Sequence, residues 1–286
     1  MKSTFHHVIV NTALTLGILT SPLSMAETAV SNTDKARALI ESIENRDPTP
    51  AGYINPTRYI QHNLAVKDGL AGFGEVLQQL PKGSAKAKVI RAFEDGDYVV
   101  LHTQYDFFGP KAGFDVFRFE QGLIVEHWDN LQATSAPNPS GRTQFDGATD
   151  ITDQDKTTNN KALVADFVSQ ILMQGQMDKI KRFIGPKDSD YLQHNPYIAD
   201  GLNGLGAALA AMAEQGQSMV YRKNHRILGQ GNFVLSISEG EFMGQDVAFY
   251  DLFRVESNKI VEHWDTVEPI LPKAKWQNQN GKFNFR

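Results

Sequence analysis

The chain has 286 residues, of which 41% are hydrophobic and 21% charged, and it contains no cysteine. This composition is typical of a globular protein with material for one large or two ordinary domains. The net charge of −5 argues against a nucleic-acid-binding protein, because phosphate binding needs a basic surface. The lack of cysteine excludes disulfides, thiolate nucleophiles and cysteine-bound metal centres.

The first residues have the pattern of a secretory signal peptide. Lys2 gives a positive start, residues 8–19 are mostly apolar, and Ser24-Met25-Ala26 offers the small residues of a cleavage site. We predict a cleaved signal over residues 1–26 and a bacterial periplasmic or secreted mature protein without stable membrane insertion. An uncleaved tether is the alternative, although the apolar stretch is shorter than the roughly 20 residues that span a bilayer.

The first half of the mature chain predicts helices followed by strands. A helix is expected over residues 34–45, where Ala36, Leu39, Ile40 and Ile43 form an apolar stripe. A second helix is expected over residues 69–80 and a strand over residues 98–108. Two final strands, residues 114–120 and 123–129, form a predicted hairpin that turns at Gln121-Gly122.

The second half repeats this order. Tyr59–Asn63 returns as Tyr191–Asn195, and Ile124–Asp129 returns unchanged as Ile260–Asp265. Blocks that match in the same order indicate a duplicated domain rather than a short-period solenoid. We predict a first domain over residues 30–132, a linker over 133–159, a second domain over 160–271 and a loosely packed polar C-terminal tail over 272–286.

These motifs carry a family resemblance. The pattern Tyr-x-Gln-His-Asn, Asp-Gly, Asp-x-Phe-Arg and Ile-Val-Glu-His-Trp-Asp resembles the SnoaL-like polyketide cyclase family, particularly members described as aldol-condensation enzymes. The resemblance covers nearly all of both copies. It implies two tandem NTF2-like α+β domains, each a cone-shaped barrel with N-terminal helices on a curved, mainly antiparallel sheet. It also implies a pocket aspartate that acts as general acid/base on a carbon next to a carbonyl.

The predicted hairpin supplies the main candidate residues. A two-residue turn would pair Asp115 with Trp128 and Phe117 with Glu126. Alternation then predicts one face with Asp115, Phe117, Glu126 and Trp128, and a matching face with Asp251, Phe253, Glu262 and Trp264. A carboxyl group among aromatic rings and near a second carboxyl is hard to ionise and suits acid/base work. We predict Asp115 and Asp251 as catalytic, with Phe117, Glu126, Trp128, Glu262 and Trp264 binding substrate.

Alternatives to this interpretation remain. Asp115 is instead a strand cap or the ion-pair partner of Arg118 if the register differs by one residue. His127 and His263 are expected on the opposite face, at an interface rather than in chemistry. Their aspartate neighbours Asp129 and Asp265 would lie on that same surface.

His102 is the third predicted catalytic residue. It resembles the family's pocket histidine, although a histidine in an apolar strand is also a common hydrogen-bonded core residue. Ile237 takes its place in the second copy, so that if only one pocket works by an Asp/His pair, the first is expected to be that pocket. Glu239, which replaces Gln104, is counted with the substrate-binding residues of the second pocket.

The Tyr-x-Gln-His-Asn blocks give the remaining candidates. Tyr59 and Tyr191 are expected to donate to an enolate oxygen, or else to be core aromatics. His62 and His194 are expected at the pocket mouth as substrate contacts, or in a turn held by the following asparagine.

No metal or cofactor is predicted. No two histidines have the spacing of a metal site on one element, and no phosphate-binding, dinucleotide or nucleophile-elbow motif occurs. The expected function is a cofactor-free enzyme that performs aldol condensation, cyclisation or isomerisation on a small apolar substrate. The alternatives are a non-catalytic binding protein and a pseudo-dimeric scaffold with filled pockets. A pseudo-dimer of the two domains, or a homo-oligomer, is compatible with all three.

Overall fold

The computed structural model describes residue 1 and residues 30–285. The predicted signal peptide therefore lies almost wholly outside the described residues. The chain divides into the units Met1–Val30 and Ser31–Arg286, and both copies lie in the second unit. Among the described residues, none of the helices has the length and apolar character needed to cross a membrane.

The first copy places two helices before a sheet. Helix α1 spans Asn32–Asn45, a 3-10 helix η1 spans Thr49–Tyr53, and α2 spans Gly69–Gln79. The strands are β1 (Ile60–Gln61), β2 (Lys86–Asp95), β3 (Tyr98–Asp106), β4 (Pro110–Glu120) and β5 (Leu123–Ala133). Their order in the sheet is β1-β5-β4-β3-β2, with β1 parallel to β5 and all other pairs antiparallel.

The second copy repeats this topology with a more irregular helical part. It contains η2 (Gln154–Lys156), α3 (Thr157–Phe167), the π-helix η3 (Val168–Met173), η4 (Met177–Arg182), η5 (Asp188–Asp190) and α4 (Gly201–Glu214). The sheet order is β6-β10-β9-β8-β7. These strands are β6 (Leu192–Gln193), β7 (Met219–Gln230), β8 (Phe233–Phe242), β9 (Gln245–Glu256) and β10 (Lys259–Pro269), and η6 (Lys273–Lys275) follows.

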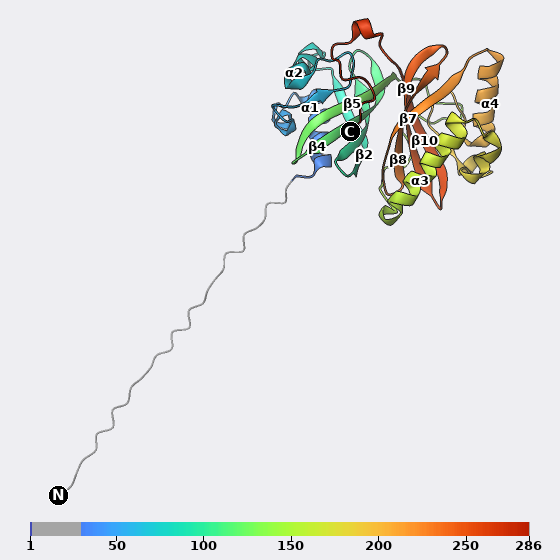
Figure 1. Ribbon diagram of the computed structural model, residues 1–286, viewed down its shortest axis with the longest axis horizontal. Coiled ribbons are helices and arrows are strands. Elements are labelled where there is room, and N and C mark those ends of the chain that lie inside the picture. Colours follow the sequence, from blue (N-terminus) through green and yellow to red (C-terminus); the bar gives the residue numbers. More distant parts are fainter. Residues whose placement is uncertain (2–29, 286) are drawn as a thin grey trace. The chain divides into compact units, whose positions relative to one another are not determined.

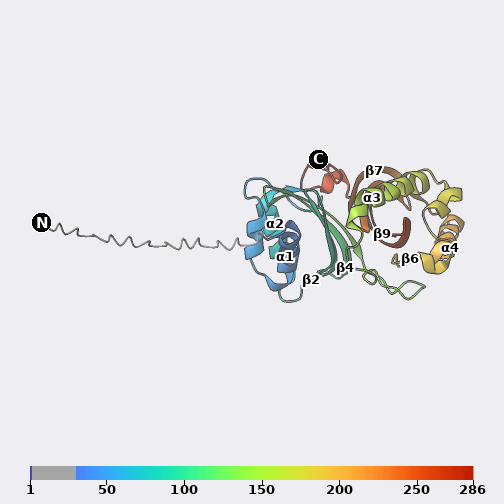
Figure 2. The same cartoon turned by 90° about the horizontal axis from the view of Figure 1, so that it is seen from below.

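The prediction of two tandem α+β domains, each with N-terminal helices on a mainly antiparallel sheet, is confirmed. Each sheet is open within the described residues, because its edge strands, β1 and β2 or β6 and β7, do not pair with each other. The helices of each copy cover one face of its open sheet. In the first copy, the apolar stripe of α1 packs on the sheet face that carries Val99 and Leu101. Figure 2 shows α1 and α2 on this side of the first sheet.

The other face of each sheet packs against the other copy (Figure 1). The shared apolar cluster includes Val116 and Trp128 from the first copy and Leu252 and Trp264 from the second. Equivalent residues meet where the copies join: the side-chain amide of Asn130 donates to the backbone oxygen of Thr266 at 2.9 Å. Each sheet thus has an inner face toward its own helices and an outer face toward the other copy.

Candidate functional site

The strand pairing within the hairpins differs from the predicted register. The turn has two residues as expected, and Phe119 pairs with Ile124. A β-bulge then leaves Val125 without a partner, so Arg118 pairs with Glu126 and Asp115 with Asp129. The second copy has the same bulge, and Asp251 pairs with Asp265. A bulge adds one residue to one strand, which exchanges the two faces of β5 and β10 beyond it.

The bulge changes which residues accompany the predicted catalytic aspartates. His127 and Asp129 lie with Asp115 on the inner face, so the prediction that they lie opposite it was wrong. Glu126 and Trp128 lie on the outer face instead. The same holds in the second copy, where His263 and Asp265 accompany Asp251, and Glu262 and Trp264 do not.

Asp115 is the centre of a buried hydrogen-bond network and is 3% exposed. Its Oδ2 accepts from the Tyr105 hydroxyl at 2.6 Å and from the Thr103 hydroxyl at 3.3 Å. Its Oδ1 lies 3.2 Å from His127 Nε2. The rings of Phe117 and His127 are stacked with their centroids 4.5 Å apart. Phe117 therefore lies on the same face as Asp115, as predicted.

The loop after β1 orients the other two members of this site. Gln61 contacts His127 Nδ1 at 3.1 Å through Nε2 and at 3.2 Å through Oε1. Asn63 donates its side-chain amide to Asp129 Oδ2 at 2.7 Å. In the Gln-His-Asn motif, the glutamine therefore contacts His127 and the asparagine contacts Asp129.

The second copy builds the same site. His263 Nε2 lies 3.1 Å from Asp251 Oδ1, and Asn195 donates to Asp265 Oδ2 at 2.7 Å. The Tyr221 hydroxyl lies 3.2 Å and 3.3 Å from the two oxygens of Asp251. Both copies therefore hold an Asp/His pair, and the histidine of each pair is His127 or His263 rather than His102.

The second copy also defines where the histidine carries its proton. Gln193 Oε1 accepts the backbone N–H groups of His194 and Asn195, both at 2.9 Å, so this atom is the amide oxygen. His263 Nδ1, also 2.9 Å away, must donate to it. Because Nδ1 carries a proton, the contact between Nε2 and Asp251 Oδ1 needs one further proton between these two atoms.

The charges around this pair favour the imidazolium form. Burial alone would lower the pKa of His263, but the hydrogen bond to Asp251 and the charges of Asp265 and Asp251 outweigh it and raise the pKa. Burial, together with the charge of Asp251, raises the pKa of Asp265 against the opposing effect of His263. The site therefore holds protons more tightly than its isolated groups would in water.

The tyrosines on the inner faces are neutral donors. Burial and the charge of Asp115 raise the pKa of Tyr105, and burial and the charge of Asp251 raise that of Tyr221. Burial and nearby carboxylates also raise the pKa of Tyr59 and Tyr191. The last two lie in the apolar cluster of their own copy. The rings of Tyr191 and His263 are stacked 6.4 Å apart.

His102 does not belong to this site. It pairs with Phe114 on β4 and lies on the outer face, where its ring stacks on Phe114 at 4.6 Å. Burial and the Arg91 charge lower its pKa well below the usual range, and Arg91 donates to its Nδ1 at 3.1 Å. The prediction that His102 lies in the pocket of Asp115 was wrong, because strand alternation places it on the face opposite Leu101, Thr103 and Tyr105.

The other predicted substrate contacts form structural networks between the copies. His62 Nε2 lies 2.8 Å from Glu126, to which Arg118 Nε donates at 2.6 Å, and the His62 ring stacks on Trp128 at 4.4 Å. Burial favours the neutral form of Glu126, but these two hydrogen bonds outweigh it and lower the pKa. The second copy repeats the network with His194, Glu262, Arg254 and Trp264.

Glu239 lies apart from both the network and the acid/base site. Its carboxylate pairs with His225 at 3.1 Å, and its side chain is 38% exposed. This places it at the surface of β8, away from Asp251.

Among residues 1 and 30–285, two groups have side chains close enough to share a metal ion. They are Asp115, His127 and Asp129 in the first copy and the matching Asp251, His263 and Asp265 in the second, with ligand atoms within 4.8 Å of one another. Carboxylates and imidazole nitrogens are suitable ligands for several divalent metals. In the second copy such an ion would have to replace the proton between His263 and Asp251.

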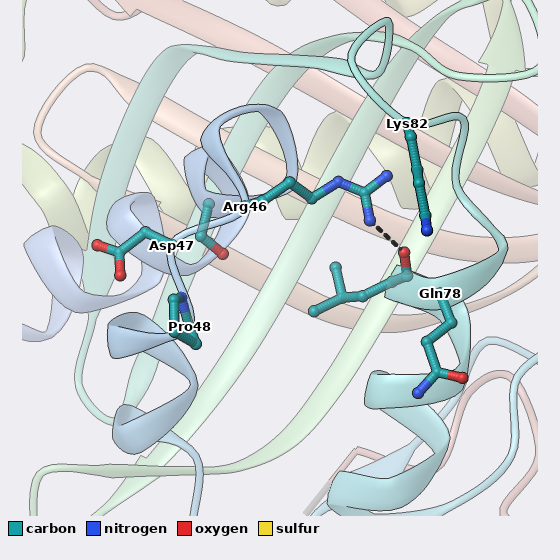
Figure 3. A pocket seen from close by; sticks show the side chains of 7 residues that line it. Arg46, Asp47, Pro48, Gln78 and Lys82 are labelled. Carbon is teal, nitrogen blue, oxygen red and sulfur yellow. Dashed lines mark hydrogen bonds between the residues drawn. The ribbon is translucent and has the colours of Figure 1, made fainter.

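A surface pocket lies beside the inner face of the first copy. It has a volume of about 440 Å³ and is bounded by the ends of α1 and α2. Figure 3 shows Arg46 and Lys82 converging on the same side of it, with Arg46 donating to the Leu77 carbonyl. Leu77 lines this pocket and also packs on the apolar cluster that contains Tyr105.

Comparison with solved structures finds domains of this kind. An NTF2-like protein of unknown function from Cytophaga hutchinsonii is 16% identical, with a TM-score of 0.33, over 37% of this chain and 94% of that chain. A SnoaL-like polyketide cyclase from Agrobacterium tumefaciens is 14% identical, with a TM-score of 0.31, over 36% and 92%. An LEH-like epoxide hydrolase from M. tuberculosis is 20% identical, with a TM-score of 0.28, over 40% and 85%.

Each of these structures matches about one copy of the duplicated chain. No protein-family model matches this chain, and no curated protein matches it.

Proposed function

We propose that this protein is a cofactor-independent acid/base enzyme that moves a proton at a carbon next to a carbonyl of a small apolar substrate. Aldol condensation, cyclisation and isomerisation all begin with this step. The proposed catalytic pairs are Asp115 with His127 and Asp251 with His263.

The observation that carries the proposal is the proton required between His263 Nε2 and Asp251 Oδ1. Backbone N–H groups fix the Gln193 amide, and that amide fixes the tautomer of the ring. A buried carboxylate paired with an imidazolium holds a base and an acid side by side near neutral pH. The same donors and acceptors recur around Asp115, which supports two sites of one chemistry.

The proposed reaction uses these groups in sequence. The aspartate carboxylate takes the proton from carbon, and the electron pair of the C–H bond forms an enolate. The histidine N–H or the neutral hydroxyl of Tyr105 or Tyr221 donates a hydrogen bond to the enolate oxygen. The protonated aspartate then returns its proton to carbon in an isomerisation, or the enolate carbon attacks a second carbonyl in a condensation.

The substrate must reach a site whose aspartate is almost fully buried. The pocket between α1 and α2 is the proposed approach in the first copy, because Leu77 both lines it and packs against the apolar cluster to which Tyr105 belongs. The mostly apolar inner face favours a substrate with few charges.

Deuterium incorporation tests the proposal directly. The mature protein is incubated in deuterated buffer with a panel of ketones and β-keto esters, and exchange at carbon is followed by NMR. We expect exchange above the buffer rate for the wild type and none above it for the Asp115→Asn/Asp251→Asn double variant. Equal exchange in both proteins would show that neither aspartate acts.

Near-complete burial of the site supports a second candidate, a non-catalytic pseudo-dimeric scaffold. Asp115 and Asp251 are only 3% and 1% exposed, and the outer faces share a large apolar cluster. A scaffold would show no exchange with any compound and no thermal shift with small apolar carbonyl compounds. A binding protein would show the thermal shift alone.

We also propose that the protein is exported and that its signal is removed after Ala26. The positive start, apolar stretch and small residues before Glu27 support this location. Mass spectrometry of the protein from a periplasmic fraction would give the mature N-terminus, and an intact Met1 would contradict the proposal.

A further inference from the structure

Each copy is followed by a segment with the same spacing of four residues. Arm 1, residues 137–148, contains Asn138, Gly141, Arg142 and Phe145. Arm 2, residues 276–285, contains Asn278, Gly281, Lys282 and Phe285. Both glycines have positive φ angles, 79° and 76°, so the backbone turns alike at the two positions.

The expectation that the C-terminal tail packs loosely was wrong, because Asn278 and Lys282 are only 5% and 7% exposed.

The arms are exchanged between the copies. Arm 1 follows the first copy but binds the second: Asn138 donates its amide to the carbonyls of Gln193 at 2.6 Å and Ile198 at 2.9 Å. Arm 2 follows the second copy but binds the first: Asn278 donates to the carbonyls of Asn63 at 2.8 Å and Val66 at 2.9 Å.

Other contacts of arm 2 fall on the same loop. Asn280 donates to the Gln61 carbonyl and to the Asp68 carboxylate, both at 3.0 Å. The backbone N–H of Gln277 donates to the Leu64 carbonyl at 2.8 Å. In arm 1, Arg142 forms the corresponding contact with Asp200, at 2.9 Å and 3.0 Å.

These two loops carry the residues that orient the acid/base groups. Residues 61–68 include Gln61, which contacts His127, and Asn63, which donates to Asp129. Residues 193–200 include Gln193 and Asn195, which do the same for His263 and Asp265. An arm that fixes the carbonyls of such a loop also limits the movement of its side chains.

Arm 2 alone adds a charge at the acid/base site. Lys282 Nζ donates to the backbone oxygen of Asp129 at 2.8 Å and lies 3.7 Å from its Oδ1. Glu268 completes the buried pair at 2.5 Å from the ammonium group. Arg142, at the matching place in arm 1, pairs with Asp200 instead of Asp265.

We propose that the arms are exchanged positioning elements, through which each copy sets the geometry of the other copy's acid/base site. Asn138 is the positioning residue for the second site, and Asn278 with Lys282 is the positioning group for the first. The kinetic part of this inference rests on the proposed function. The structural part does not, because it concerns which loop loosens when an arm is released.

Hydrogen–deuterium exchange followed by mass spectrometry tests the crossed dependence in the full mature chain. Asn278→Ala should speed amide exchange in residues 61–68 about tenfold and leave residues 193–200 unchanged, because two buried hydrogen bonds are lost on one loop only. Asn138→Ala should give the reverse pattern. Gln279→Ala, at the exposed neighbour of Asn278, is the matched control and should change neither loop. Should Asn278→Ala fail to fold, Asn280→Ala repeats the test on the same loop.

The outcomes separate this inference from the proposed function. The inference would be overturned if amide exchange became faster in both loops equally, only in the arm's own copy, or not at all. These outcomes do not depend on whether the protein has activity. Where carbon-acid exchange is detected, Asn278→Ala should lower kcat about tenfold in the Asp251→Asn background with little change in KM. In the Asp115→Asn background the same change should leave kcat unaltered, and an equal loss in both backgrounds would contradict a positioning role.

Discussion

The two copies keep one acid/base arrangement while the strands around it have changed. Tyr105 on β3 donates to Asp115, and it pairs across the sheet with Ala87 on β2. In the second copy this cross-strand pair is reversed: Tyr221 on β7 donates to Asp251 and pairs with Gly240 on β8. The contact between hydroxyl and carboxylate is therefore common to the copies, although the strand that supplies the hydroxyl is not.

Small residues make each arrangement possible. A Cβ atom at Gly113 would lie 2.8 Å from the Tyr105 ring, and one at Gly240 would lie 2.9 Å from the Phe249 ring. In the second copy Phe249 stands at the place of Gly113 and stacks on Tyr221 at 4.1 Å. The second site thus holds two stacked rings where the first holds one, which gives the two inner faces different shapes.

The polarity of the inner faces differs as well. Next to Asp251, the side chain of Asn224 donates to the hydroxyls of Ser236 at 2.9 Å and Ser238 at 3.1 Å. The first copy has Leu101 opposite Asp115 at the place of Ser236. The two inner faces therefore differ in polarity as well as in shape.

Loss of the histidine should have the largest effect on this comparison. In the Asp251→Asn background, His127→Asn should lower carbon-acid exchange by about 10²–10³-fold, because a hydrogen-bond donor to the enolate oxygen is removed. In the Asp115→Asn background, His263→Asn should act equally on the second site. Deuterium-exchange rates measure both, and an effect in one copy only would show that the sites differ in chemistry and not merely in shape.

Loss of a tyrosine hydroxyl should affect stability. Tyr105→Phe and Tyr221→Phe should each lower the free energy of unfolding by about 1–3 kcal/mol, because a buried carboxylate loses a donor. Moving the tyrosine in the first copy, by Ala87→Tyr with Tyr105→Gly, should restore part of that loss. Denaturant unfolding measures each change, and a relocated tyrosine that restores nothing would contradict the equivalence of the two arrangements.

The second copy should lose stability as pH rises. His263 has a raised pKa in the folded protein, so its stabilising effect is complete below its unfolded pKa and disappears as pH passes the folded value. Thermal unfolding of the wild type against His263→Asn across neutral pH checks this, since the variant should lack that part of the dependence. A wild type that gains stability relative to His263→Asn as pH rises over this range would contradict the prediction.

The smallest effect is expected on the outer face. His102→Ile installs the residue of the second copy, and Arg91 keeps its bonds to the carbonyls of Ala148, Phe145 and Asp146. Stability should change by no more than about 1 kcal/mol, and deuterium exchange at carbon should not change. A large loss of exchange activity would return His102 to the catalytic group.

The duplication, the helices and the hairpin turns could be predicted from sequence, because repeated motifs and apolar periodicity are local signals. The faces of the hairpin could not, because a single extra residue at Val125 or Val261 reverses the alternation without any signal in composition. Strands β2 and β7 were missed, and they supply Arg91 and Tyr221. The exchanged arms were also missed, although the spacing shared by Asn138–Phe145 and Asn278–Phe285 was a readable signal.

The imidazolium form of His263, with a proton on Nε2 facing the Asp251 carboxylate, is the central claim, and ¹⁵N NMR of the His263 ring tests it most directly. At neutral pH both ring nitrogens should show attached protons, with His263→Asn used to assign the signals. A ring with a proton on Nδ1 and a bare Nε2 would contradict the account, because the carboxylate would then face no acid.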